Sequence, residues 1–143
     1  MEFDKAGLET YLTDKELEAV DGIWLKFPGG RKLHVLRAGG SNAKYTRIAA
    51  SVTKPYQRQI QRGTIDPEKV SELMLEIYLQ SVILDWAGFK DAQGKEIPYS
   101  REAAREFFTQ VPEMFTEVMD LATDLALFQE QEVEETSKHM GES

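Results

Sequence analysis

The chain has 143 residues, the size of one globular domain, and a net charge of −8. It contains no cysteine, which excludes a disulfide framework, a thiolate metal site and a cysteine nucleophile. The first residues lack the basic region and apolar run of a signal peptide, and no stretch approaches the roughly 20 apolar residues of a membrane span. We therefore expect a cytoplasmic protein that has no contact with a membrane.

The charge is unevenly distributed along the chain. Residues 1–21 hold two basic and seven acidic side chains, residues 22–65 hold nine and none, and residues 66–143 hold six and eighteen, so the blocks carry −5, +9 and −12. The basic block faces either the protein's own acidic helices or an acidic partner. Nucleic acid is the less favoured partner, because the block lacks the repeated exposed aromatic residues that stack on bases.

The first 40 residues predict a short helix followed by a β-hairpin. Thr13 and Glu16 have the spacing of a capping box, and the helix that they begin ends near Gly22. Alternating apolar residues on either side of the turn at 28–30 then predict a hairpin over about residues 22–38. A lone hairpin is marginally stable in water, so we expect it to pack on helices or to pair with another chain.

Two helical segments follow the hairpin. Ser41 or Asn42 can cap a helix that breaks at Pro55, because proline disfavours helix at the residue before it. Asp66 and Pro67 begin a second helix. We expect this central helix to run as far as Trp86, because its second half is apolar nearly all round, as in a helix that is buried on most sides.

A corner that contains Gly94 and Pro98 separates the central helix from the last two. Ser100 caps the next helix, Pro112 interrupts it, and a final helix extends to Phe128. The fold class is therefore mainly α: a single compact domain over residues 1–128, with about five helices and one small N-terminal hairpin. Residues 129–143 form an acidic tail that we expect to be flexible. Structural roles are predicted for Asp66, Pro67, Trp86, Gly94, Pro98 and Ser100, with Trp86 closing one edge of the core.

No catalytic, cofactor or metal constellation is present. His34 and His139 have no second ligand at metal-binding spacing, and the acidic residues around Gly94 do not match a calcium loop. Ser100 has no histidine close to it in sequence. We predict a protein that is not an enzyme and acts through its surfaces.

The corner resembles the tail assembly chaperones of long-tailed bacteriophages. The matching features are Leu-Asp-Trp at 84–86, Asp-x-x-Gly-Lys at 91–95, Ile-Pro-Tyr-Ser at 97–100, Pro112 and a final aromatic residue at Phe128. Asp-Gly-Ile-Trp at 21–24 and Lys-Pro-Tyr-Gln-Arg at 54–58 also fit, whereas Asn42 lacks the proline that follows in the family's turn. Together these motifs cover about residues 20–128.

The resemblance implies a non-enzymatic helper in the host cytoplasm, which binds the tape measure protein and recruits subunits of the major tail tube protein. Self-association, or association with a longer frameshifted form, fits the same family pattern. Ten residues are predicted to contact partners: Trp24, Arg31, Lys32, Arg37, Arg47, Arg58, Arg62, Phe89, Tyr99 and Phe128. The alternatives are a small nucleic-acid-binding regulator that uses the basic segment 26–62, and a structural tail or connector component of the virion.

Overall fold

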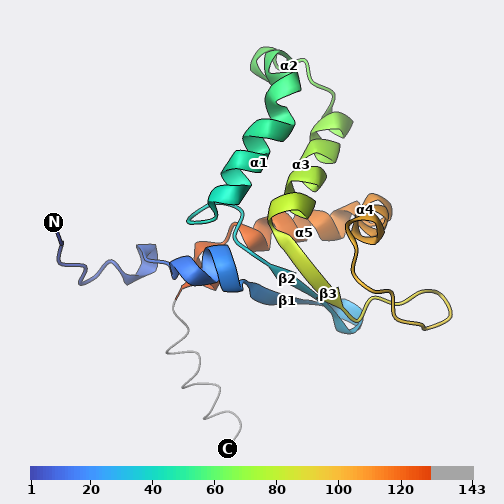
Figure 1. Ribbon diagram of the computed structural model, residues 1–143, viewed down its shortest axis with the longest axis horizontal. Helices are drawn as coiled ribbons and strands as arrows, with labels where there is room; N and C mark the ends of the chain where they lie inside the picture. Colours follow the sequence, from blue (N-terminus) through green and yellow to red (C-terminus); the bar gives the residue numbers. More distant parts are fainter. Residues whose placement is uncertain (130–143) are drawn as a thin grey trace, which may run out of the picture.

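The computed structural model describes residues 1–129 as a small antiparallel sheet with helices packed on it and a helical arm that projects away (Figure 1). The strands are β1 (Ile23–Phe27), β2 (Arg31–Val35) and β3 (Ile83–Ala87). The helices are α1 (Ala43–Thr53), α2 (Gln57–Arg62), α3 (Pro67–Ser81), α4 (Arg101–Gln110) and α5 (Pro112–Ala122). The mainly α class is confirmed. The predicted tail lies, except for residue 129, outside the described residues.

The predicted hairpin is present as β1 and β2. These strands pair antiparallel, with Trp24 opposite His34 and Leu25 opposite Leu33. The alternation works as expected: Leu25, Leu33 and Val35 are buried under the helices, while Trp24 and the lysines lie on the other face. At the turn, Gly29 and Gly30 both have positive φ, which residues with a side chain rarely adopt.

The sheet has three strands, and this corrects the prediction of a hairpin alone. The helix expected to reach Trp86 ends at Ser81, and residues 83–87 form β3, which pairs antiparallel with β2. Leu33 lies opposite Trp86, and Val35 opposite Ile83. An apolar run is compatible with a buried helix or a buried strand. Here the β-branched and aromatic residues suit a strand, and pairing with β2 satisfies their backbone groups.

The local start and stop signals were predicted well. The Asp66 carboxylate accepts a hydrogen bond from the Glu68 amide (3.0 Å), and the Ser100 hydroxyl accepts one from the Ala103 amide (3.0 Å). Pro55 lies in a 3-10 turn between α1 and α2, and Pro112 is the first residue of α5. Two ends differ from expectation: Asp14, not Thr13, caps the first helical turn, and α5 ends at Ala122, before a separate 3-10 turn at Leu125–Phe128.

The core gathers aromatic side chains between the sheet and helices α3, α4 and α5. Trp86 is buried, stacks on Phe89 at 4.1 Å between ring centroids, and donates from its indole nitrogen to the Ile97 carbonyl (2.8 Å). Tyr99 and Phe107 meet the Trp86 ring edge-on. The core position of Trp86 is confirmed, although the residue lies on a strand and not at a helix end.

The arm, defined as residues 43–74, contrasts with the rest of the molecule. It comprises α1, α2 and the first half of α3, and it stands away from the sheet in Figure 1. Helix α1 packs along α3, yet neither α1 nor α2 contains a fully buried residue. We call the remaining described residues the body. The α3 helix therefore joins the two, with its second half in the core.

Candidate partner-binding groove

A groove lies at the junction between the arm and the body. It has a volume of about 650 Å³ and runs between α3 and α5, with part of α4 at one end. Its apolar lining comprises Val70, Met74, Leu75, Phe108, Pro112, Phe115 and Met119. We call this feature the α3–α5 groove. It lies where α3 passes from the arm into the body (Figure 1).

The lining follows from helical spacing. Pro112, Phe115, Thr116 and Met119 are related by three, four and seven positions, so they share one side of α5. On α3, Val70 and Met74 are one turn apart. Phe115 is buried and forms the floor, whereas Met74 and Met119 are partly exposed. Methionine is flexible and polarisable, which suits a surface that adapts to a partner.

The rim of the groove carries acidic residues, and an ion pair next to the groove joins helices α3 and α4. Glu68 and Glu72 of α3 line the groove. One turn beyond Glu72, the Glu76 carboxylate pairs with the Arg105 guanidinium of α4; one of the two bonds, from Nη2 to Oε2, measures 3.0 Å. The hydrogen bond from Arg105 lowers the pKa of Glu76 and outweighs the opposing effect of burial, so the pair stays ionised at neutral pH. Glu72 is itself paired with Lys69 at 3.2 Å, so Glu68 is the lining carboxylate that makes no ion pair within residues 1–129.

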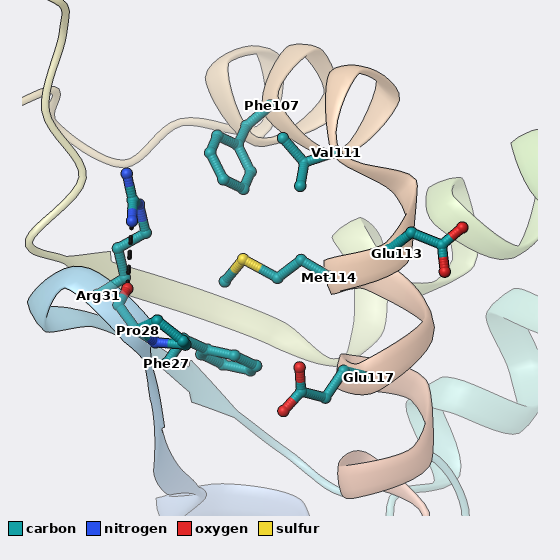
Figure 2. Close-up of a pocket in the computed structure, with 8 residues that line it drawn as sticks. All are labelled: Phe27, Pro28, Arg31, Phe107, Val111, Glu113, Met114 and Glu117. Atoms are coloured by element: carbon teal, nitrogen blue, oxygen red, sulfur yellow. Dashed lines mark hydrogen bonds between the residues drawn. The ribbon is translucent and has the colours of Figure 1, made fainter.

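The predicted partner-binding cations do not gather at one surface. Arg47, Arg58 and Arg62 are exposed on the arm, and Lys32 is exposed on the outer face of the sheet. None of these four makes an ion pair within residues 1–129. Arg31 lies at the far side of α5 from the groove, beside Phe27, Phe107 and Met114 (Figure 2).

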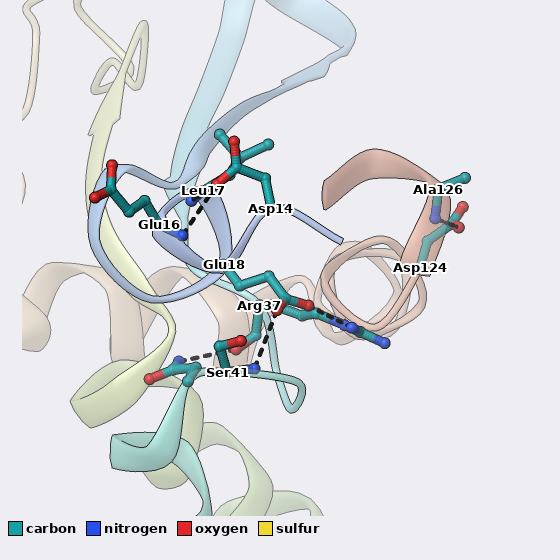
Figure 3. Close-up of polar contacts among 9 residues, drawn as sticks. Asp14, Glu16, Leu17, Glu18, Arg37, Ser41, Asp124 and Ala126 are labelled. Atoms are coloured by element: carbon teal, nitrogen blue, oxygen red, sulfur yellow. Dashed lines mark hydrogen bonds and ion pairs between the residues drawn. The ribbon is translucent and has the colours of Figure 1, made fainter. Parts of the chain in front are cut away.

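Arg37 has an internal role, which corrects its assignment to a partner surface. Its guanidinium pairs with the carboxylate of Glu18, whose other oxygen accepts from the Ser41 amide at 3.1 Å (Figure 3). Glu18 is 0% exposed. Burial alone would raise the pKa of its carboxyl, but the hydrogen bonds from Arg37 and Ser41 outweigh burial and leave the pKa below its usual value. Of the nine basic residues of 22–65, only Arg37 forms an ion pair with a described acid.

The predicted aromatic contacts divide by exposure. Trp24 is 46% exposed on the outer face of the sheet, where it stacks on His34 at 4.9 Å between centroids. Phe89 and Phe128 are buried at 2% and 0% exposure, so neither presents an exposed ring on the surface. Tyr99 is partly exposed and packs its ring against Trp86. Whether each aromatic ring is exposed depends on which distant parts of the chain pack over it. The pattern of neighbouring residues in a single sequence does not contain this information.

None of the residues that line the groove is among the ten predicted partner-binding residues. Met74, Phe115 and Met119 have ordinary helical spacing, and only the separation of α3 from α5 leaves part of their surface open. The acidic residues Glu68 and Glu72, next to the apolar residues of α3, were the one feature of the sequence that could have indicated a solvent-facing groove here. Within residues 1–129, no three histidine, aspartate or glutamate side chains come close enough to hold a metal ion. No helix in that range is both long and apolar enough to cross a membrane.

A family model for the YdaY prophage protein matches residues 40–139 of the chain, which is more than half of its length. The chain belongs to the YdaY prophage protein family. Its origin is therefore a phage or prophage. The matched range includes the arm, the corner around Trp86 and helices α4 and α5, so the whole α3–α5 groove lies inside the family region. No curated protein and no solved structure matches the chain.

Proposed function

We propose that this prophage protein is a tail assembly chaperone, which binds the helical tape measure protein and helps recruit tail-tube subunits without catalysing a reaction. The observation that carries the proposal is the α3–α5 groove, an open apolar trough between two helices with acid at its rim. The prophage family and the motif order across residues 20–128 agree with this role. The host cytoplasm is the compartment in which such a chaperone acts.

The groove suits an amphipathic helix as its occupant. A helix that lies in a groove presents apolar side chains at positions i, i+3, i+4 and i+7, and the facing wall of α5 has the same periodicity. Glu68, which makes no ion pair within residues 1–129, favours lysine or arginine beside that apolar stripe, whereas Glu72 is already paired with Lys69. Each contact would be weak, but several copies bound along one long client gain avidity.

Coexpression with a helical tape measure fragment tests the proposal. Val70 lines the groove and is exposed, so Val70→Lys places a cation against the client while preserving helix propensity. The wild-type chain should keep the fragment soluble, and Val70→Lys should reduce the soluble fragment about tenfold, which corresponds to about 1.4 kcal/mol of binding. The measurement is the amount of fragment that copurifies.

Val20→Lys is the matched control, because Val20 is also an exposed valine on a helical turn but lies outside the groove. It should behave as the wild type. The proposal loses its support if the fragment is equally insoluble with and without the chain, or if the two lysine variants act alike.

One observation favours a second candidate, a nucleic-acid-binding regulator. Five cations of the arm are exposed and form no ion pair with a described acid: Lys44, Arg47, Lys54, Arg58 and Arg62. Binding through them would weaken steeply with salt as counterions are released. The absence of an oligonucleotide mobility shift at low salt would eliminate this candidate.

A further inference from the structure

The Arg31 side chain is held in place at the end of the sheet nearest α4 and α5. Its Nη1 donates to the Pro28 carbonyl at 3.1 Å, and its guanidinium carbon lies 6.0 Å from the centre of the Phe89 ring. A side chain at position 29 would approach Nη1 to 2.5 Å, so glycine at that position makes room for the guanidinium. The cation is therefore oriented by the hairpin turn before any ligand arrives.

Among residues 1–129, the same guanidinium lacks an anionic partner. No carboxylate of residues 1–129 lies within ion-pair distance of it, although Glu106, Glu113 and Glu117 line the hollows beside it. Its Nε is buried and has no hydrogen-bond acceptor among the described residues. A charged donor that is removed from water without an acceptor is unfavourable. Arg37 also has a buried Nε without an acceptor, but its guanidinium is paired with Glu18, whereas Arg31 has no such anion among residues 1–129.

Apolar hollows lie on both sides of Arg31. The first, of about 380 Å³, is walled by Phe27, Phe107, Val111 and Met114 (Figure 2). The second, of about 360 Å³, is walled by Trp86, Phe89, Ile97, Ala103 and Phe107. Arg31 and Phe107 line both, so the two hollows adjoin across one cation.

We propose that this surface binds an extended peptide segment of a partner protein in which an acidic residue is flanked, two positions away on each side, by apolar residues. Alternate side chains of an extended chain point the same way, about 6.6 Å apart. The central carboxylate would pair with Arg31 while the two apolar side chains enter the hollows. Glu113 and Glu117 at the outer edge of the first hollow favour a basic residue beyond the motif.

The site is separate from the α3–α5 groove, because the two use opposite sides of α5. Met114 and Glu117 face the first of the two hollows, whereas Phe115, Thr116 and Met119 face the groove. The inference goes beyond the proposed function and does not depend on it. If both hold, one molecule can bind a helical client and a second protein at once.

Titration of the isotope-labelled full chain with synthetic peptides tests the proposal. The probe is a capped five-residue peptide with leucine at both ends, glutamate in the centre and serine between them; its partner has glutamine in the centre. The glutamate peptide should shift the NMR signals of the Met114 methyl group and the Phe107 ring, and should bind at least tenfold more tightly than the glutamine peptide. Arg31→Gln should abolish that preference.

Lys32→Gln is the matched control, because Lys32 is the next residue but lies on the outer face of the sheet. It should leave the preference unchanged. Val111→Glu, at an exposed position of the first hollow, tests the site without altering Arg31 and should weaken the glutamate peptide at least fivefold. Equal binding of the two peptides, or signal changes confined to other surfaces, would overturn the proposal. Val70→Lys should not affect this titration, because Val70 lines neither hollow. The peptide proposal can therefore fail or succeed independently of the chaperone proposal.

Discussion

The arm and the body show two ways in which one chain uses apolar residues. In the body, Trp86, Phe108 and Phe115 are buried among other rings. In the arm, the apolar residues of α1 are only partly covered, and Ile60 of α2 is 44% exposed. Burial is the main source of stability. The body therefore holds the fold, and the arm supplies exposed surface at a lower local stability.

The largest effect is expected from the body. Trp86→Ala removes a ring that contacts Phe89, Tyr99 and Phe107, and should lower the free energy of unfolding by about 3–5 kcal/mol. Urea unfolding followed by circular dichroism measures it. Trp24→Ala, on the open face of the same sheet, should change stability by less than about 1 kcal/mol. If Trp86→Ala unfolded at the same urea concentration as the wild type, the buried face of the sheet would not contribute more stability than the open face.

A smaller effect is expected at the polar contact within the body. Glu18→Gln leaves Arg37 without its anion and should cost about 3 kcal/mol at pH 7. Because the folded state lowers the pKa of Glu18 below its usual 4.5, the stabilisation is present above that pH and is lost as the pH falls through the lowered value.

Urea unfolding from pH 7 to pH 3 checks both statements about Glu18. The wild type should lose stability in the acid range, and its difference from Glu18→Gln should shrink there. Glu16→Gln, at an exposed neighbouring carboxylate, should follow the wild type. A constant difference across the whole pH range would contradict the role of the Glu18 charge.

The smallest effect is expected in the arm. Gly63 ends α2 with a φ of +67°, and a methyl group there would meet no atom within 4 Å, so Gly63→Ala should cost only the backbone strain of about 1 kcal/mol. Amide exchange should accelerate in α1 and α2 and stay unchanged in the sheet. Gly94→Ala, also open and at positive φ, is the control and should leave the arm unaffected. Equal acceleration in arm and sheet would show that the two regions open together.

Features set by neighbouring residues were predictable from the sequence. The caps at Asp66 and Ser100 and the break at Pro55 depend on a few adjacent atoms, and they were located correctly. The third strand was not, because residues 82–86 suit a helix or a strand and the choice is made by β2, which is distant in sequence. The burial of Glu18 was missed for the same reason: its partner Arg37 belongs to another element.

The prediction of surfaces had a similar limit. The charge blocks indicated one basic segment that could form an electropositive face, whereas the structure distributes its cations among the arm, the sheet and the two hollows beside Arg31. The α3–α5 groove could not be read from the sequence, because an apolar residue on a helix has the same spacing whether its neighbour covers it or stands apart.

The position of β3 next to β2 also bears on how the chain folds. These strands are separated by residues 36–82, and the Leu36 amide donates to the Val82 carbonyl at 2.8 Å where the connection begins and ends. Helices α1 and α3 pack side by side within that connection. Helical contacts between near neighbours form quickly, whereas closing a long disordered loop is entropically unfavourable. We expect the arm to form first, which would shorten the effective loop between β2 and β3 and so reduce the entropy cost of pairing them.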